Sequence, residues 1–139
     1  MGELHATAGS SISCILVDDH PVVLDALADL LESEGIAVVG RAEDASEALA
    51  LRRAPGVVVV SDFRLPGRTG LQLARDLLEA DPACRVVLYT ATISSRGALE
   101  ALRNGVCGVV LKGSLPVELP RAVRAVAAGG TFVDPRVAG

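Results

Sequence analysis

Four consecutive valines, Val57–Val60, constrain the fold of this chain more than any other feature of its sequence. The dipeptide Pro55-Gly56 precedes the run, and Asp62 follows it after one serine. A short apolar run without polar alternation is typical of a strand that is buried on both faces, as in the middle of a parallel sheet. The rest of the chain must then supply neighbouring strands, and helices for both faces of the sheet.

The remaining sequence supplies both kinds of element. Short apolar runs predict four further strands, at residues 12–17, 36–39, 84–89 and 106–111. Apolar residues at helical spacing predict five helices, at residues 21–34, 45–49, 71–78, 95–104 and 119–127. Pro21 fits the first turn of the first helix and Gly35 its end, and Asp44 with Glu47 predicts a capping box at the start of the second. Five strands that alternate with five helices through short connections predict a (βα)5 unit. The fold class is therefore α/β, a doubly wound, flavodoxin-like five-stranded parallel sheet.

The 139 residues are enough for one domain with a sizeable core. Residues 1–11 are small and polar, and we expect a flexible leader there; the domain itself is expected at 12–128. A net charge of −4 and an aromatic content of 2% argue against a nucleic-acid-binding surface on this domain. The chain shows neither a secretory signal nor an apolar run of about 18 residues, so we expect a cytoplasmic protein without a membrane partner.

Polar residues stand where the predicted strands end. In doubly wound sheets the carboxyl ends of the strands form the functional edge. Three carboxylates, one hydroxyl with a small neighbour, and one ammonium group are expected to meet there: Asp18, Asp19, Asp62, Thr90, Ala91 and Lys112. A single aspartate after a strand is often only a turn or cap residue, and a single lysine is often only solvated. Suitable polar residues at the ends of several predicted strands are harder to obtain by chance than any one of them alone.

Crowded carboxylates repel one another unless a cation joins them. All-oxygen coordination with few protein ligands suits Mg²⁺, which keeps several of its waters. We expect Asp19 and Asp62 to be direct ligands and Asp18 to act through water. The backbone carbonyl of Arg64 is a candidate third ligand.

A magnesium site beside one lysine and one threonine suits a phosphoryl group. Lys112 would neutralise the phosphoryl oxygens, and the Thr90 hydroxyl would hydrogen-bond one of them. No Ser-His pair or cysteine nucleophile is evident, so the expected acceptor is the Asp62 carboxylate on the central strand. The small side chain of Ala91 would leave room for the phosphoryl group.

These residues resemble the receiver domain of two-component response regulators over about residues 12–130. The resemblance rests on Val-Asp-Asp-His-Pro (17–21), Asp-Phe-Arg-Leu-Pro-Gly-Arg-Thr-Gly (62–70), Tyr-Thr-Ala (89–91) and Gly-Val-Cys-Gly-Val-Val-Leu-Lys (105–112). It implies the receiver strand order 2-1-3-4-5 and phosphorylation of Asp62 by a sensor histidine kinase. Mg²⁺ would be held by Asp19, Asp62 and the Arg64 carbonyl, and Asp18 would support it. Thr90 would be the switch hydroxyl and Lys112 the phosphate-binding lysine; no enzyme activity beyond phosphotransfer to its own aspartate and self-dephosphorylation is implied.

The Asp-Asp-His-Pro motif, Gly113 after the lysine, and the tail Ala-Gly-Gly-Thr-Phe-Val-Asp-Pro resemble LuxR/NarL-type transcription regulators. That resemblance implies that residues 129–139 begin a linker to a helix-turn-helix domain outside this chain, through which alone DNA would be bound. The output would be a changed surface on the helix at 95–104, the strand at 106–111 and the helix at 119–127. A homodimer through that surface, or through the helices at 21–34 and 119–127, is a further possibility. The sequence support for the second interface is Val22 and Leu24, which we expect outside the core face of the helix at 21–34.

The sequence departs from the family at two positions. Val109 stands where the family usually has an aromatic switch residue, and we interpret it as a strand residue that faces the helix at 95–104. Gly113 stands where many relatives have a proline after a cis bond. Arg64 and Thr92 occupy the positions that tune phosphate loss in the family. Two alternatives stay open: a pseudo-receiver that acts by protein contact without phosphorylation, which Val109 favours, and a magnesium-dependent phosphatase. Such phosphatases usually carry a second aspartate where this chain has Arg64.

Overall fold

The computed structural model describes residues 11–138. In chain order the elements are β1 (Ile12–Val17), α2 (Pro21–Ser33), β2 (Ile36–Ala42), α3 (Ala45–Ala50), β3 (Val58–Ser61), β4 (Arg64–Leu65), β5 (Arg68–Thr69), α4 (Gly70–Ala80), β6 (Arg85–Thr90), α5 (Ser95–Arg103), β7 (Gly108–Leu111), α6 (Glu118–Ala127), β8 (Phe132–Val133) and α7 (Pro135–Ala138). The leader expected at residues 1–11 lies, apart from Ser11, outside the described residues.

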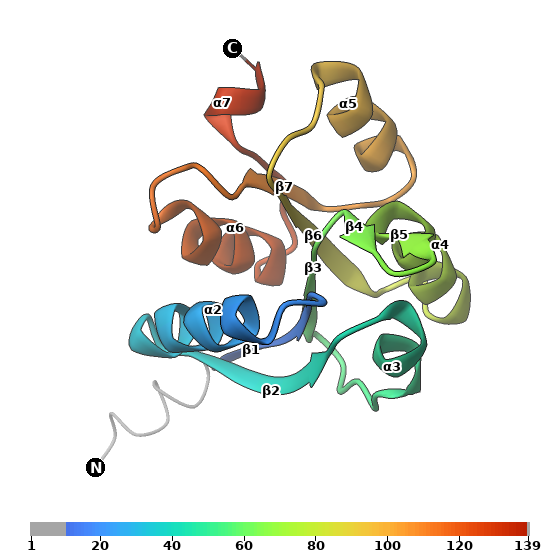
Figure 1. Ribbon diagram of the computed structural model, residues 1–139, viewed down its shortest axis with the longest axis vertical. Helices are drawn as coiled ribbons and strands as arrows, with labels where there is room; N and C mark the ends of the chain where they lie inside the picture. The colour runs from blue at the N-terminus through green and yellow to red at the C-terminus, as the bar shows by residue number, and fades with distance from the viewer. Residues whose placement is uncertain (1–10, 139) are drawn as a thin grey trace.

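A parallel sheet forms the middle of the molecule, in the order β2-β1-β3-β6-β7-β8 (Figure 1). Its first five strands are the predicted ones, and their order confirms the expected 2-1-3-4-5 arrangement. The valine strand β3 pairs with β1 on one side and β6 on the other, so it is central as predicted.

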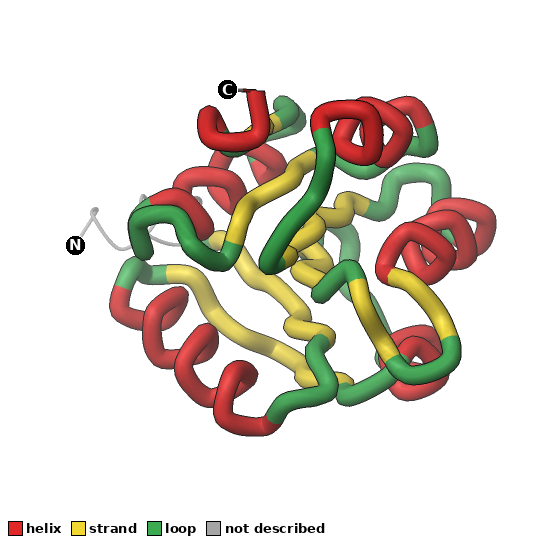
Figure 2. The backbone as a smooth tube through the Cα atoms, turned by 45° about the horizontal axis from the view of Figure 1, so that its top comes forward, coloured by secondary structure: helices red, strands yellow, loops and turns green. Residues whose placement is uncertain are grey.

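Helices cover both faces of the sheet, as Figures 1 and 2 show. Val58 and Val60 face a cluster that includes the buried leucines of α2 and the apolar stripe of α6. Val59 points the other way, into a cluster built with α3, α4 and α5. Alternate valines of one strand therefore serve the two halves of the core, which is why the run has no polar residue.

Three small features were not predicted, and the last of them is the short helix α7. A two-stranded hairpin, β4–β5, lies within the loop that follows β3. A sixth strand, β8, pairs in parallel with β7 and places Phe132 beside Gly108 and Val133 beside Val109. The described part of the tail, which we assigned to a linker, is therefore packed on the domain, and Val137 of α7 is buried in the core.

The two apolar residues cited for a dimer through α2 and α6 differ in their exposure to solvent. Val22 is 79% exposed, but Leu24 is buried against the sheet, so the prediction that it lies outside the core face is wrong. The α6 stripe is likewise buried in the core. Residues 11–138 contain no cis peptide bond, so the bond between Lys112 and Gly113 is trans. No helix among these residues is long and apolar enough to cross a membrane.

Candidate functional site

Backbone hydrogen bonds beyond the strands bring the predicted residues to one edge of the sheet. The N–H of Asp62 donates to the carbonyl of Val17 at 2.9 Å, which holds the residue after β3 beside the end of β1. The N–H of Lys112 donates to the carbonyl of Thr90 at 2.8 Å, which joins the ends of β7 and β6 in the same way. The parallel sheet thus delivers side chains that are far apart in sequence to a common point.

The loop after Asp62 is fixed by the start of α4. Thr69 caps this helix, with a reciprocal hydrogen bond pair to Gln72, and the N–H of Gly70 donates to the carbonyl of Phe63 at 2.6 Å. A Cβ atom on Gly70 would lie 2.3 Å from the carbonyl oxygen of Asp62. Glycine is therefore required here because the helix begins directly against the backbone of Asp62.

Lys112 joins two aspartates across the edge of the sheet. Its Nζ lies 3.0 Å from Oδ2 of Asp18 and 3.0 Å from Oδ2 of Asp62. The side chain of Asp18 is 2% exposed and that of Asp62 is 10% exposed, so these pairs are largely desolvated. The ring of Tyr89 lies beneath the ammonium group, with its centroid 5.8 Å away, and adds a cation–π contact.

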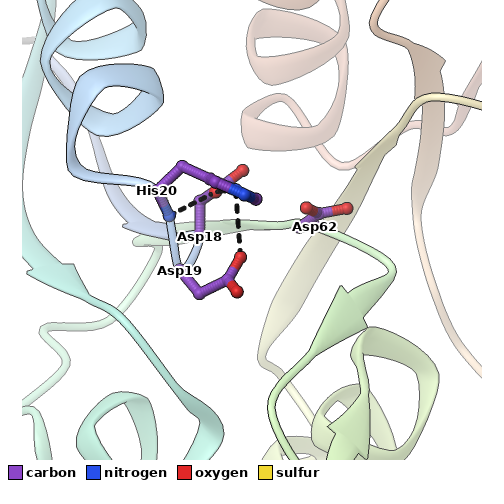
Figure 3. A group of neighbouring side chains, drawn as sticks. All are labelled: Asp18, Asp19, His20 and Asp62. Atoms are coloured by element: carbon purple, nitrogen blue, oxygen red, sulfur yellow. Dashed lines mark hydrogen bonds and ion pairs between the residues drawn. The ribbon is translucent and has the colours of Figure 1, made fainter.

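His20 bridges two of the aspartates, Asp18 and Asp19 (Figure 3). Its Nδ1 lies 3.0 Å from Oδ1 of Asp18 and 3.1 Å from Oδ1 of Asp19, and its backbone N–H donates to Oδ1 of Asp18 at 2.9 Å. Asp18, Asp19, His20 and Asp62 each offer a ligand atom within 4.8 Å of one another. Three carboxylates this close suit a hard divalent cation, and the half-exposed Asp19 gives solvent access that Mg²⁺ with retained waters needs.

The charges in the pocket reinforce each other. Burial alone would raise the pKa of Asp18, but hydrogen bonds from the His20 backbone and from Lys112 overcome it and lower that pKa below its usual value. Burial alone would lower the pKa of Lys112, but the two carboxylates raise it above its usual value. Both groups are therefore charged near neutral pH.

The remaining predicted residues line the same pocket or its rim. A hollow of about 400 Å³ is lined by Asp19, His20, Asp62, Arg64, Leu65, Pro66, Thr90, Ala91 and Lys112. Thr90 is buried, and its hydroxyl donates to the carbonyl of Thr92 at 3.2 Å. The exposed Arg64 donates its backbone N–H to Oδ1 of Asp62 at 3.3 Å. Of the expected site residues on the loops after the strands, Asp18 and Thr92 do not line the hollow.

Val109 lies in the core on the α5 side of the sheet, in one cluster with Ala98 and Ala101. This agrees with its prediction as a strand residue that faces the helix at 95–104. Three residues that contact the site or its supports were not predicted: His20, Tyr89 and Asp134. The position of His20, two residues after Asp18 in the Asp-Asp-His-Pro motif, was the signal that could have placed it.

A doubly wound parallel sheet with three aspartates and one lysine at its carboxyl edge defines a receiver domain. The sequence matches the family described as response regulator receiver domain over residues 14–124. That match covers most of the chain, and the chain belongs to this family.

Relatives of known identity point to the LuxR/NarL type. The DNA-binding transcriptional activator DevR/DosR of Mycobacterium tuberculosis is 40% identical over 131 residues, which are 91% of this chain and 59% of that protein. Response regulator GacA of Pseudomonas protegens is 33% identical over 91% of this chain and 61% of that protein. This chain therefore spans about three-fifths of the length of these curated relatives.

Solved structures give the same assignment. A LuxR-family two-component response regulator from Aurantimonas sp. SI85-9A1 superposes with a TM-score of 0.86 at 38% identity, covering 92% of this chain and 93% of that one. The signal receiver domain of the putative response regulator NarL from Mycobacterium tuberculosis gives 0.77 at 33% identity, covering 86% and 98%. Both identities are high enough to support the family and not only the fold.

Proposed function

We propose that this chain is the phosphoacceptor receiver of a LuxR/NarL-type response regulator and accepts a phosphoryl group on Asp62 from a sensor histidine kinase. The observation that carries the proposal is Lys112 Nζ at 3.0 Å from a carboxylate oxygen of Asp62, at the mouth of an open hollow. In the transfer, an Asp62 oxygen forms a bond to phosphorus while the bond from phosphorus to the donor histidine nitrogen breaks. Lys112 neutralises charge on the phosphoryl oxygens.

Mg²⁺ fits the oxygen-rich donor set at this edge. Asp19 and Asp62 would bind it directly, Asp18 would act through water, and the Arg64 carbonyl would complete the protein ligands. The bound ion would supply positive charge to the transferred phosphoryl group. His20, which bridges Asp18 and Asp19, would hold these two carboxylates close to one another.

The switch would begin at Thr90. Its hydroxyl donates to the carbonyl of Thr92, so a phosphoryl oxygen on Asp62 offers it a stronger, charged acceptor. Exchange of that partner frees the Thr92 carbonyl and the loop that leads into α5. The α5–β7–α6 surface would change in consequence, and Arg64 and Thr92 beside the phosphoryl group would tune its lifetime.

The output would be transcription control through a DNA-binding domain that is not part of this chain. DevR/DosR is described as a DNA-binding transcriptional activator, and one relative of known structure, RcsB, is described as dimers bound to DNA. We propose a homodimer of this chain as the form that phosphorylation favours, acting in the cytoplasm. Val22 is the exposed apolar residue of α2 that such an interface could use.

A pseudo-receiver is the second candidate, and Val109 favours it. The residue is fully buried and too short to swing between two positions as an aromatic ring does. If Thr90 and Val109 are not coupled, the domain could control its output by protein contact alone.

Incubation of the chain with acetyl phosphate and Mg²⁺ tests the two candidates. We expect one base-labile adduct of about 80 Da, the mass added by one phosphoryl group, on the wild-type chain and none on Asp62→Asn. Asp44→Asn is the matched control, because Asp44 caps α3 away from the hollow and its variant should be labelled like wild type. A wild-type chain that takes up no phosphoryl group would favour the pseudo-receiver.

A further inference from the structure

Asp134 is a buried carboxylate outside the acidic pocket. It follows β8 and is 0% exposed. Its Oδ2 accepts hydrogen bonds from the backbone N–H of Leu111 at 2.9 Å and from the hydroxyl of Ser114. Its Oδ1 accepts one from the backbone N–H of Arg136 at 2.9 Å. Three donors hold this side chain in one orientation.

Two of these donors flank Lys112 in the sequence. Leu111 directly precedes the lysine, and Ser114 follows two residues later; the Ser114 N–H donates back to the Leu111 carbonyl at 3.1 Å and closes a turn. The guanidinium of Arg136 donates to the carbonyl of Gly113 at 2.7 Å. The turn that carries Lys112 is therefore bonded to the C-terminal tail through three of its four residues.

The same tail also contacts α5. The Ser95 hydroxyl donates to the carbonyl of Val137 at 3.0 Å, and the side chain of Val137 lies in one buried cluster with Ala98 and Val109. The N–H of Asp134 donates to the carbonyl of Val109 at 2.8 Å. The tail, defined here as residues 132–138, thus spans from the lysine turn to the helix that follows Thr90.

The charge state of Asp134 agrees with this role. Burial alone would raise its pKa, but hydrogen bonds from the Ser114 hydroxyl and from the Leu111 and Arg136 backbones lower it below its usual value. The group is therefore a charged acceptor near neutral pH, and charged acceptors form the stronger hydrogen bonds.

We infer that Asp134 is a positioning residue, which holds the Lys112 turn and so couples docking of the tail to phosphoryl transfer onto Asp62. The inference rests on the function proposed above. Lys112 reaches Asp62 at the end of a flexible side chain, so the backbone at its base determines how well Nζ is placed. When the tail is released the turn loses three hydrogen bonds, and Nζ spends less time beside Asp62. Because Lys112 would also bind the phosphoryl group, a phosphoryl group on Asp62 and the docked tail would each stabilise the other, and this equilibrium coupling is reciprocal.

If Asp134 had only a structural role, its substitution would have a different effect. As a cap for the short α7 helix alone, it would contribute to stability and leave the reaction of the folded chain unchanged. The test must therefore separate the rate of phosphorylation from the fraction of folded protein.

The experiment compares the whole chain with Asp134→Asn and Ser114→Ala in acetyl phosphate and saturating Mg²⁺, at a temperature where melting curves show all variants folded. Asp134→Asn should lower the maximal rate of Asp62 phosphorylation about tenfold, because small displacements of a charged group are costly in catalysis. Ser114→Ala should lower it less, and Ser114→Thr should restore it. The Kd for Mg²⁺ should not rise above the wild-type value, since neither residue contacts the acidic cluster and a less well placed Lys112 competes less for its carboxylates.

Asp81→Asn is the matched control. Asp81 also accepts a backbone N–H two residues later, at 3.0 Å from Ala83, but it precedes β6 at the opposite edge of the sheet. Its variant should be phosphorylated at the wild-type rate.

Hydrogen exchange supplies the reciprocal measurement. Beryllofluoride with Mg²⁺ should slow exchange of the Arg136 amide in wild type and leave it unchanged in Asp134→Asn. A folded Asp134→Asn chain that is phosphorylated at the wild-type rate would overturn the inference and leave the proposed function standing. A wild-type chain that takes up no phosphoryl group would remove both.

Discussion

At the scale of single residues, Lys112 is the cation that pairs with two carboxylates of the site, those of Asp18 and Asp62. It is the only lysine in the sequence; the other twelve side chains that carry a full positive charge are arginines. An ammonium group is a compact charge that fits between Asp18 and Asp62, whereas a guanidinium is longer, planar and binds in a fixed fork geometry. The choice of lysine at this position therefore follows from the geometry of the two ion pairs.

Lys112→Met should make stability depend strongly on Mg²⁺. Without the ammonium group two buried carboxylates lose their counter-charge, and we expect the free energy of unfolding to fall by about 1–3 kcal/mol. Mg²⁺ competes with no lysine in this variant, so it should raise the melting temperature more than it does in wild type. Thermal unfolding with and without Mg²⁺ measures both effects.

Arg41→Met is the matched control, because Arg41 forms an exposed ion pair with Asp25 away from the site. Its melting temperature should respond to Mg²⁺ as wild type does. An equal Mg²⁺ response in Lys112→Met and wild type would show that Lys112 and the ion do not share the carboxylates.

At the scale of elements, the contact between the start of α4 and the Asp62 loop fixes the acceptor. Gly70→Ala would place a methyl group 2.3 Å from the Asp62 carbonyl oxygen and 3.1 Å from Cα of Phe63, so backbone must move. We expect a loss of about 1–3 kcal/mol in the free energy of unfolding, and slower phosphorylation of Asp62. Denaturant unfolding and the acetyl phosphate assay measure these effects.

Gly113→Ala is a sharp comparison because Gly113 directly follows Lys112. A Cβ there meets nothing within 4 Å, and the residue does not have a positive φ. The substitution should change the free energy of unfolding by less than about 1 kcal/mol. If Gly70→Ala were as harmless as Gly113→Ala, the close packing of α4 on the acceptor loop would be contradicted.

The sequence predicted the helices because apolar residues recur in them at helical spacing, and the strands because they are short apolar runs. The helix at 21–34 was expected from Pro21 and Gly35, and α2 runs from Pro21 to Ser33 with Gly35 at a φ of +83°. Asp44 caps α3 as expected, but the Glu47 side chain accepts from the N–H of Glu43 and not from the cap itself. Residues 132–133 form a strand only because β7 offers a free edge, which local sequence does not reveal.

The site was predictable to the extent that strand ends determine it. Asp18, Asp62 and Lys112 lie together because three parallel strands end at one edge. Asp134 lies beyond the last predicted element and contacts the turn beside the site through backbone groups, so the tail motif that contains it gave no sign of this role. Interactions made between side chains and distant backbone are the part that sequence patterns do not encode.

At the scale of the whole molecule, buried aspartates make stability depend on acid. Asp18 and Asp134 both have a pKa below the usual 3.8, because hydrogen bonds to their charged forms outweigh their burial. A group whose pKa is lower in the folded chain stabilises the fold fully above its unfolded pKa. That contribution is lost as the pH falls through 3.8 towards the folded value.

The unfolding free energy of wild type should therefore fall as the pH is lowered below 3.8. Asp134→Asn should be less stable than wild type near neutral pH, but it loses one acid-sensitive group, so its curve should be flatter and approach the wild-type curve in acid. Denaturant unfolding at several pH values measures both curves. Parallel curves for Asp134→Asn and wild type would mean that hydrogen bonds from the three donors do not stabilise the charged form of Asp134. The inference that Asp134 holds the Lys112 turn would then lose its electrostatic support.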